Sequence, residues 1–275
     1  MRRIGDSPPV RALLIALALV LTMLFLVVPL ISIFYQAFAS GLGEFWLNLS
    51  DEYTWSAITL TLLVTVITVP VNLIFGVFLA WLVTRFVFPG RRILQTLIDI
   101  PFAVSPVVAG LLYLLLYGRG GWLGSWLENY DLQLMFAWPG MVLVTVFVTC
   151  PFVARELIPL MQAQGSAEEE AGVTLGAGGW TLFRRITLPN IRWALVYGVI
   201  LTNARAIGEF GAVSVVSGSI RGETINLPLQ VELLYQDYNT VGAFTSAALL
   251  AALAIVTLMI KAVLEWHTHR REKTA

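Results

Sequence analysis

The chain has 275 residues, of which 58% are hydrophobic and only 12% are charged, and its mean hydropathy is +0.81. Soluble domains carry about twice this charged fraction, so the composition excludes an ordinary water-soluble globule and indicates a chain that folds in lipid. Basic and acidic residues number 17 each, so net charge gives no sign of a nucleic-acid partner, and we expect none. The single cysteine, Cys150, excludes a disulfide framework and a cysteine-rich metal site.

Six apolar segments have about the 20 residues that a helix needs to cross a bilayer. They lie near 12–38, 57–84, 93–117, 137–161, 193–217 and 242–264. The first could be mistaken for a signal peptide, but its apolar run exceeds the roughly 7–15 residues of a signal-peptide core, so we expect an uncleaved span. We therefore predict an all-α, polytopic membrane protein with six transmembrane helices, built as a single domain over residues 1–275.

Arginine and lysine gather in the loops on one side of these spans. The residues concerned are Arg2, Arg3, Arg11, Arg85, Arg91, Arg92, Arg155, Arg184, Arg185, Arg192, Lys261, Arg270, Arg271 and Lys273. The loops on the opposite side contain only Arg119 and Arg221. Because basic loops stay in the cytoplasm, the pattern predicts that both termini and the segment 162–192 are cytoplasmic.

The motifs of catalytic and nucleotide-binding sites are missing. The sequence has no GxxxxGK[ST] loop, and its first lysine is Lys261, so we expect this chain to bind no nucleotide cofactor. His267 and His269 are its two histidines, and we interpret them as part of a solvated tail and not as metal ligands. Two tail histidines also cannot supply a Ser/His/Asp triad. We therefore expect no catalytic residue and no metal site, which favours transport over enzymatic activity.

Two opposite charges lie inside the fifth predicted span, at Arg205 and Glu209. Ionisable groups at membrane depth are costly and usually face a cavity or a partner. With this spacing they would share one helical face and could pair, so they form either a polar contact between helices or part of a path in which Arg205 attracts an anion. Asn203 and Ser217 add polar groups to the same span, and we treat all four residues as a candidate translocation path.

Between the fourth and fifth spans, residues 166–192 form a polar segment that we predict to be a helical hairpin. Ser166 is a plausible N-cap, with Glu169 as its capping-box partner. The glycines from Gly176 to Gly179 should break the helix, and a second short helix should end at Leu188-Pro189. A polar hairpin between two lipid-spanning helices suggests a surface that contacts another protein.

The spacing inside this hairpin resembles the EAA loop of ABC importer permeases, written EAA-x3-G-x9-I-x-LP. Every anchor matches except the second alanine, which is Gly172 here and lowers the expected helix stability by about 1 kcal/mol. In that family the loop docks into a groove of a separate ATP-binding subunit, which would bind the ATP and Mg²⁺ that this chain does not. The resemblance implies that the residues coupling this chain to such an ATPase are Glu169, Glu170, Ala171, Gly176, Ile186, Leu188 and Pro189.

Two longer stretches, 99–113 (DIPFAVSPVVAGLLY) and 203–239 (beginning NARAIGEFGAVSVVSG), resemble sulfate/thiosulfate permeases of the CysW type. The resemblance covers roughly residues 10–265. It implies a MetI-like type I ABC importer permease fold, and a transmembrane permease subunit of an ATP-driven sulfate/thiosulfate importer in a bacterial-type inner membrane. The partners it implies are a second, CysT-type permease, two ATP-binding subunits, a periplasmic sulfate-binding protein and the lipid bilayer.

Three other functions stay open on the residues alone. Molybdate permeases share the GEFGA core, so the chain could belong to a molybdate or tungstate importer. An ATP-independent anion carrier could use Arg205 and Glu209 as a relay, and would need an ion gradient but no ATPase. A membrane signalling scaffold could use the hairpin to contact its partner and would show no flux at all.

Overall fold

The computed structural model describes residues 8–272 and is helical, with no strand in this range. Its elements are α1 (Pro8–Thr22), η1 (Met23–Val27), α2 (Val28–Phe38), α3 (Leu42–Leu49), α4 (Glu52–Arg85), α5 (Arg91–Ala103), α6 (Pro106–Tyr117), α7 (Gly124–Asn129), α8 (Trp138–Thr149), α9 (Pro151–Gln164), α10 (Ala167–Thr174), α11 (Gly179–Leu182), η2 (Phe183–Thr187), α12 (Leu188–Ile207), α13 (Gly211–Val216), α14 (Leu227–Gln236) and α15 (Thr240–Glu272). Arg2, Arg3 and Lys273 lie outside the described residues, and so do the side chains of His267 and His269.

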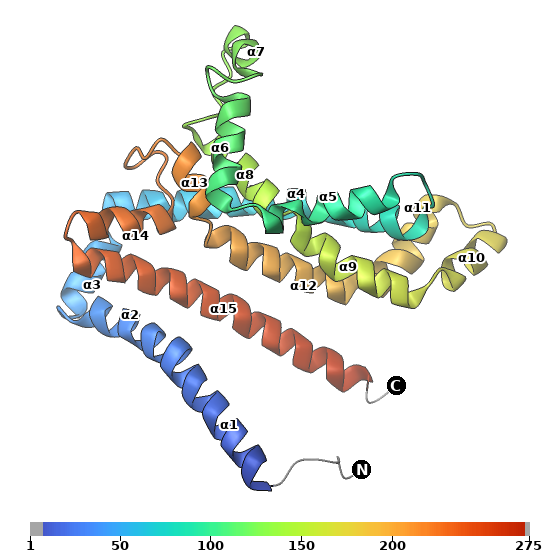
Figure 1. Cartoon of the computed structure of the whole chain (residues 1–275), viewed down its shortest axis with the longest axis horizontal. Coiled ribbons are helices and arrows are strands. Elements are labelled where there is room, and N and C mark those ends of the chain that lie inside the picture. Colours follow the sequence, from blue (N-terminus) through green and yellow to red (C-terminus); the bar gives the residue numbers. More distant parts are fainter. Residues whose placement is uncertain (1–7, 273–275) are drawn as a thin grey trace.

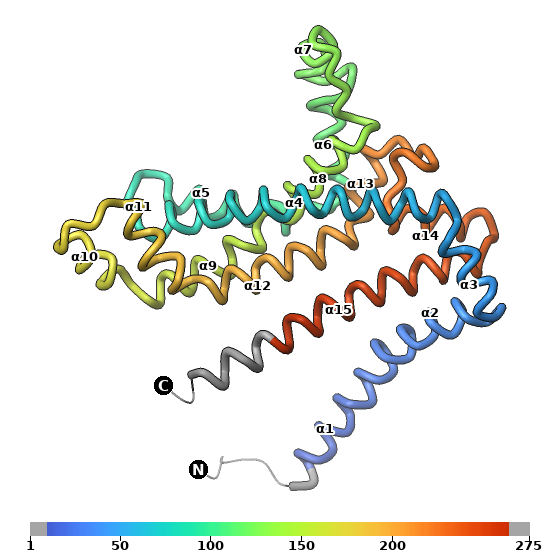
Figure 2. The backbone as a smooth tube through the Cα atoms, turned by 180° about the vertical axis from the view of Figure 1, so that it is seen from behind, coloured from blue at the N-terminus to red at the C-terminus, as the bar shows by residue number. Residues whose placement is uncertain are grey.

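The long helices run side by side along the longest axis of the molecule (Figure 1). Helices α10 and α11 lie at one end of this axis, whereas α3 and α14 lie at the other, and α6 and α7 project to the side. Helix α4 packs against α8, α9 and α12. Seen from behind, α4 extends from the α3 end to the α11 end (Figure 2), so a single helix connects the two ends of the molecule.

Four helical segments in the described part of the chain are long and apolar enough to cross a membrane. They are Val10–Phe38, Glu52–Arg85, Trp138–Gln164 and Thr240–Val263, and they overlap four of the predicted spans. Helices α5 and α6 meet the same criteria only as a pair bent by 108°. The span predicted near 193–217 is divided between α12 and α13, so the count of six spans stays a prediction.

The third predicted span is not one straight helix, and the sequence around Pro106 explains why. Helix α5 ends at Ala103, and α6 begins at Pro106. The two residues between them, Val104 and Ser105, are extended, with ψ of 132° and 136°. A residue that precedes proline avoids the α conformation because the proline ring crowds its backbone. The bend therefore follows from the local sequence.

Small residues let α4, α9 and α12 pack closely around Val153 of α9, which is completely buried. A Cβ added to Gly76 of α4 would lie 2.6 Å from Cβ of Val153, and one added to Gly198 of α12 would lie 3.0 Å from its Cα. In lipid, helices associate through such van der Waals contact and through hydrogen bonds. One such hydrogen bond is buried: Asn72 Nδ2 of α4 donates to Thr149 Oγ1 at 2.6 Å.

Candidate functional site

The hairpin of residues 166–192 turns at Gly176, which has φ of +83°. The end of α10 has the two hydrogen bonds of a Schellman motif. The N–H of Ala177 donates to the carbonyl oxygen of Gly172 at 3.0 Å, and that of Gly176 donates to Val173 at 2.9 Å. Glycine adopts a positive φ at no steric cost, so the expected helix break at this position is confirmed.

The second arm of the hairpin does not end at Leu188-Pro189, as predicted, but continues into α12. Helix α11 leads into the π-helical turn η2, which leads directly into α12. The N–H of Leu188 donates to the carbonyl oxygen of Phe183 across this wider turn. Pro189 lies in the first turn of α12, where a missing N–H is tolerated. The second arm of the hairpin and α12 are thus one unbroken helical segment, from Gly179 to Ile207.

Gly172 occupies the place of the second alanine of the EAA pattern for a packing reason. A Cβ at this position would lie 2.5 Å from Cδ2 of Leu182 and 2.8 Å from Cδ1 of Ile186. Helix α10 therefore lies directly against the second arm of the hairpin. Ile186, one of the residues that the resemblance implies for coupling to the ATPase, packs against α10 in this arrangement.

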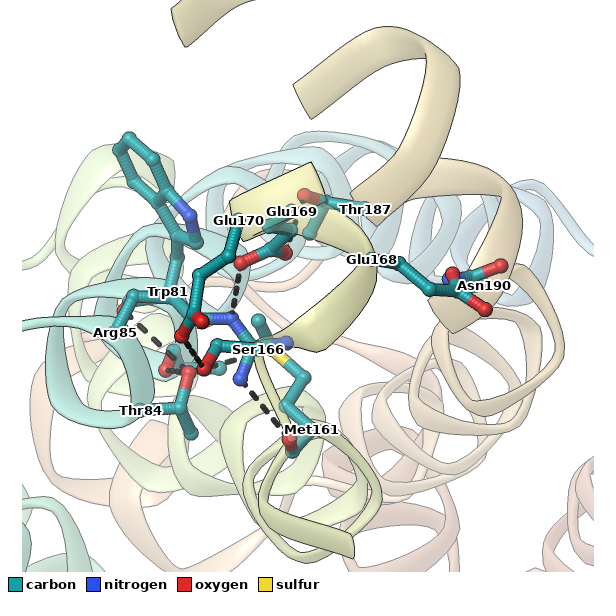
Figure 3. Close-up of polar contacts among 11 residues, drawn as sticks. Trp81, Thr84, Arg85, Met161, Ser166, Glu168, Glu169, Glu170, Thr187 and Asn190 are labelled. Carbon is teal, nitrogen blue, oxygen red and sulfur yellow. Dashed lines mark hydrogen bonds and ion pairs between the residues drawn. The ribbon is translucent and has the colours of Figure 1, made fainter. Parts of the chain in front are cut away.

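The carboxylate of Glu169 points inward and binds two groups from other elements (Figure 3). Its Oε2 lies 2.6 Å from Nε of Arg85, the last residue of α4. The N–H of that nitrogen is not aligned for a hydrogen bond, so the contact is an ion pair by distance. Its Oε1 accepts from Thr187 Oγ1 at 2.7 Å. The side chains of Arg85 and Glu169 are only 12% and 15% exposed, so the pair is largely buried.

The acids on either side of Glu169 point elsewhere (Figure 3). Glu168 Oε2 accepts from Asn190 Nδ2 at 2.5 Å, whereas Glu170 is exposed and its Oε1 accepts from Ser166 Oγ, also at 2.5 Å. The predicted capping box is therefore wrong, because the Arg85 cation and the Thr187 hydroxyl take the Glu169 carboxylate. All three acids still lie in the first turn of α10, where negative charge is favoured by the helix dipole.

A polar cavity of about 180 Å³ lies beneath these contacts, lined by Arg85, Gln164, Gly165, Glu168, Glu169, Ile186, Thr187 and Asn190. Small-molecule sites are usually about 300–1,000 Å³, so this cavity suits water molecules between polar side chains. In the described part of the chain, no group of three or more His, Cys, Asp or Glu side chains could hold a metal ion.

The tip of the hairpin exposes large apolar side chains. Val173, Leu175 and Trp180 are 58%, 87% and 73% exposed, and the ring of Trp180 stacks on that of Phe183 with centroids 5.8 Å apart. Exposed apolar groups that gather at one place mark contact surfaces. Because they lie at one end of the long axis (Figure 1), the tip is accessible to another protein.

A second polar site lies where α12 ends. Helix α12 stops at Ile207, so the prediction that Arg205 and Glu209 share a helical face is wrong, although they do pair. Arg205 Nη1 lies 2.6 Å from Glu209 Oε2, and the two side chains are 33% and 0% exposed. Glu209 Oε1 also accepts from the N–H of Ala212 at 2.9 Å. A charge buried this completely requires such compensation.

Asn226, which the sequence analysis missed, holds this break in place. Its Nδ2 donates to the carbonyl oxygen of Glu209 at 2.8 Å, and its Oδ1 accepts from the N–H of Leu229 at 3.2 Å. The next N–H, of Leu227, donates to Thr61 Oγ1 of α4 at 2.8 Å. An asparagine directly before Leu-Pro is a helix N-cap pattern, and this pattern could have identified the residue.

The other predicted path residues are placed differently from this pair. Asn203 is half-buried on α12. Ser217 is completely buried, and its Oγ accepts from the N–H of Ser219 at 3.2 Å, which stabilises the turn after α13. The sequence predicts Arg85 only as one of the basic loop residues. Its pairing with Glu169 could not be predicted, because nothing in the sequence indicates which acid lies beside it.

Comparison with protein families identifies the kind of chain that carries these two sites. Residues 72–273 match the model of the family described as "Binding-protein-dependent transport system inner membrane component". The chain belongs to this family. These inner-membrane components are permease subunits, so the chain is a multi-pass membrane protein and a transport subunit, not an enzyme.

Individual members of the family are close in sequence over almost the whole chain. The sulfate transport system permease protein CysW of Escherichia coli (strain K12) is 65% identical over 95% of this chain and 90% of its own length. The CysW protein of Synechocystis sp. is 52% identical over 94% of both chains. The sulfate transport system permease protein CysT of Escherichia coli (strain K12) is 35% identical over 87% of both chains. These similarities place the chain among inner-membrane components of the CysW type.

Two solved structures of inner-membrane components have the same fold. One is a bacterial ABC transporter involved in the import of alginate, with a TM-score of 0.77 and 19% identity over 95% of both chains. The other is a bacterial alginate ABC transporter in complex with an alginate-bound periplasmic protein, with a TM-score of 0.76 and 20% identity over 91% of both chains. The predicted all-α, MetI-like permease fold is confirmed.

Replacing Gly176 by serine should loosen the hairpin, whereas the same change at Gly178 should not. A non-glycine residue in the left-handed region costs roughly 1–2 kcal/mol, which raises the open population of the hairpin about 5–30-fold. Gly178 has φ of −73° and is the N-cap of α11, where serine is favoured. Limited trypsin digestion of the purified permease at the exposed Arg184 and Arg185 measures this opening. Equal cleavage rates of the two variants would contradict the role of the turn.

Proposed function

We propose that the chain is a permease subunit of an ATP-driven sulfate/thiosulfate importer in a bacterial-type inner membrane. The observation that carries this proposal is the 65% identity to the Escherichia coli sulfate permease CysW over 95% of the chain. Such similarity extends across both polar sites, the 166–192 hairpin and the Arg205–Glu209 pair. The chain itself supplies no nucleotide-binding loop, so the energy must come from a partner.

The proposed complex contains a second permease, two ATP-binding subunits that hold ATP and Mg²⁺, and a periplasmic sulfate-binding protein. The 35% identity to CysT supports a pair of homologous permeases, of which this chain forms half of the translocation path. The alginate transporter of the same fold, solved with its periplasmic protein bound, supports delivery of the substrate by a separate binding protein.

The 166–192 hairpin is proposed to couple this chain to the ATP-binding subunit. Its exposed tip around Leu175 and Trp180 offers the apolar contact surface, and Glu170 beside it is exposed. Ala171 and Gly176 shape the tip, whereas Glu169, Ile186, Leu188 and Pro189 hold it to the rest of the molecule. Because the partner hydrolyses cytoplasmic ATP, the hairpin and both termini would face the cytoplasm, as the basic loops predict.

The translocation path is proposed to pass Arg205, Glu209, Asn203 and Ser217. Arg205 is the residue that could attract a dianion, since a third of its side chain is exposed while Glu209 is fully buried. Asn203, on the same helix, could donate a hydrogen bond to an oxyanion. Ser217 would act indirectly, through the turn that it stabilises.

Reconstitution in proteoliposomes tests the whole proposal. A complex of the two permeases, the ATP-binding subunits and the binding protein should import radiolabelled sulfate. Import should require ATP and Mg²⁺ on the side of the membrane that the hairpin faces. Thiosulfate should compete with sulfate, and molybdate should compete less. Uptake driven by an ion gradient without the ATPase would identify a carrier, absence of any flux would identify a scaffold, and stronger competition by molybdate would identify a molybdate importer.

Replacing Trp180 by alanine should weaken binding of the ATP-binding subunit by about 2 kcal/mol, roughly 30-fold, because buried aromatic anchors dominate interface energies. Trp122 is also highly exposed, at 90%, but lies in the loop before α7, far from the hairpin (Figure 1). Trp122→Ala should leave the affinity unchanged. Titration of the detergent-solubilised permease pair with the ATP-binding subunit measures both. If Trp122→Ala is the change that weakens binding, the ATP-binding subunit binds at the α7 end of the molecule and the proposed cytoplasmic orientation of the hairpin is wrong.

Replacing Arg205 by glutamine should lower sulfate uptake by about tenfold or more, because a charged hydrogen bond to the anion is lost. The single change leaves the Glu209 carboxylate buried without its cation, which by itself destabilises the protein. The double variant Arg205→Gln/Glu209→Gln removes both charges and should restore the protein level but not the uptake. Binding of the ATP-binding subunit serves as the control. Wild-type uptake by the double variant would exclude Arg205 from the path.

A further inference from the structure

We infer that the Arg85–Glu169 ion pair is the contact through which the 166–192 hairpin moves helix α4, so that Arg85 and Glu169 are positioning residues for transport. The inference rests on the proposed coupling function and assigns it a specific route. Of the three neighbouring acids, Glu170 is exposed and accepts a hydrogen bond from Ser166, whereas Glu169 turns inward to Arg85 of α4 (Figure 3).

The pair joins elements that no short covalent link connects. Arg85 ends α4, and Glu169 lies in α10. The guanidinium also donates through Nη1 to the carbonyl oxygen of Met161 at 3.0 Å, one of the last four carbonyls of α9, which have no partner within their own helix. Thr187 of η2 donates to the other oxygen of Glu169. One arginine and one glutamate thus hold α4, α9, α10 and η2 together.

The covalent links of the hairpin lead to α9 and α12 but not to α4. Motion of the hairpin can therefore reach α4 only through side chains or through these two neighbours. Another direct contact is between the rings of Trp81 and Phe183, with centroids 6.2 Å apart. An apolar contact of this kind tolerates sliding, whereas separating the ion pair would leave two largely buried charges uncompensated. The ion pair is accordingly the contact that can both push and pull α4.

Helix α4 is suited to carry such a motion to the opposite end of the molecule. It has 34 residues, which corresponds to roughly 50 Å of helix, and it runs from the hairpin end to the α3 end (Figure 2). In its distant half, Thr61 Oγ1 accepts from the N–H of Leu227 at 2.8 Å. Leu227 directly follows Asn226, which holds the backbone of Glu209. A displacement of Arg85 would thus reach the break that carries the Arg205–Glu209 pair.

The experiment compares Arg85→Gln, Glu169→Gln and the double variant in the reconstituted complex, measuring sulfate imported per ATP hydrolysed. Each single variant should lower this ratio at least about fivefold, the lower range of allosteric coupling, while the ATP-binding subunit stays bound and active. Because the two residues act through each other, the double variant should be no worse than the more damaging single one. Glu169→Gln keeps an acceptor for Thr187, so it decides the outcome if Arg85→Gln does not fold.

Arg155→Gln is the matched control. Arg155 forms a pair of the same chemistry with Asp99 of α5, with Nε 2.9 Å from Oδ1, but both side chains are about half exposed. This variant should keep the wild-type ratio. An unchanged ratio in the Arg85 and Glu169 variants, additive losses in the double variant, or loss of the ATP-binding subunit would overturn the inference. Absence of ATP-dependent sulfate uptake by the unmodified complex would instead overturn the proposed function.

Discussion

Inside a bilayer no water can hydrogen-bond a polar group or screen a charge, and the structure depends on how the chain meets this constraint. Where the backbone is helical, its polar groups pair within the helix. Where a helix breaks, other side chains must take over, and Asn226 and Thr61 do so at the end of α12. The carboxylate of Glu209 meets the same constraint through Arg205 and the N–H of Ala212.

The Arg85–Glu169 and Arg205–Glu209 ion pairs differ in what surrounds them. Glu169 and Arg85 are both largely buried and join four elements, so the pair behaves as a fixed connection between the hairpin and α4. In the other pair only Glu209 is fully buried, while a third of Arg205 is exposed. Its cation can therefore meet a second anion without the helices separating. One arrangement suits the transmission of force and the other suits the exchange of a counter-ion.

Much of this architecture could be predicted from the sequence, because lipid imposes a simple rule on composition. Apolar length identifies the long helices, and the spacing from Glu170 to Pro189 identifies the hairpin before any coordinates are known. The bend before Pro106 also agrees with the local sequence, although residues 93–117 were predicted as one span and helices continue through Pro70, Pro101 and Pro159. These features depend on neighbours in the sequence.

The remaining features depend on contacts between distant segments. The sequence around Ser166 and Glu169 fits a capping box, but in the structure the Glu169 carboxylate pairs with Arg85 of α4 instead. Similarly, the sequence near 193–217 looks like one span, but its break is held by Asn226 from a later segment. Gly172 looks like a weakness of α10 until Leu182 and Ile186 are seen to occupy the space of its missing methyl group. A single sequence does not contain these pairings.

The 166–192 hairpin is connected rigidly to α12 and flexibly to α9. On one side it continues without interruption through the π-helical turn into α12. On the other side it joins α9 through Gly165, at φ of +70°, a residue type whose backbone rotates easily. A hairpin connected in this way can pivot about Gly165, and α12 would turn with it. Pressure on its tip would therefore reach α12 directly through the backbone, but would reach α9 less directly, through Gly165 and through the bond between Arg85 and Met161.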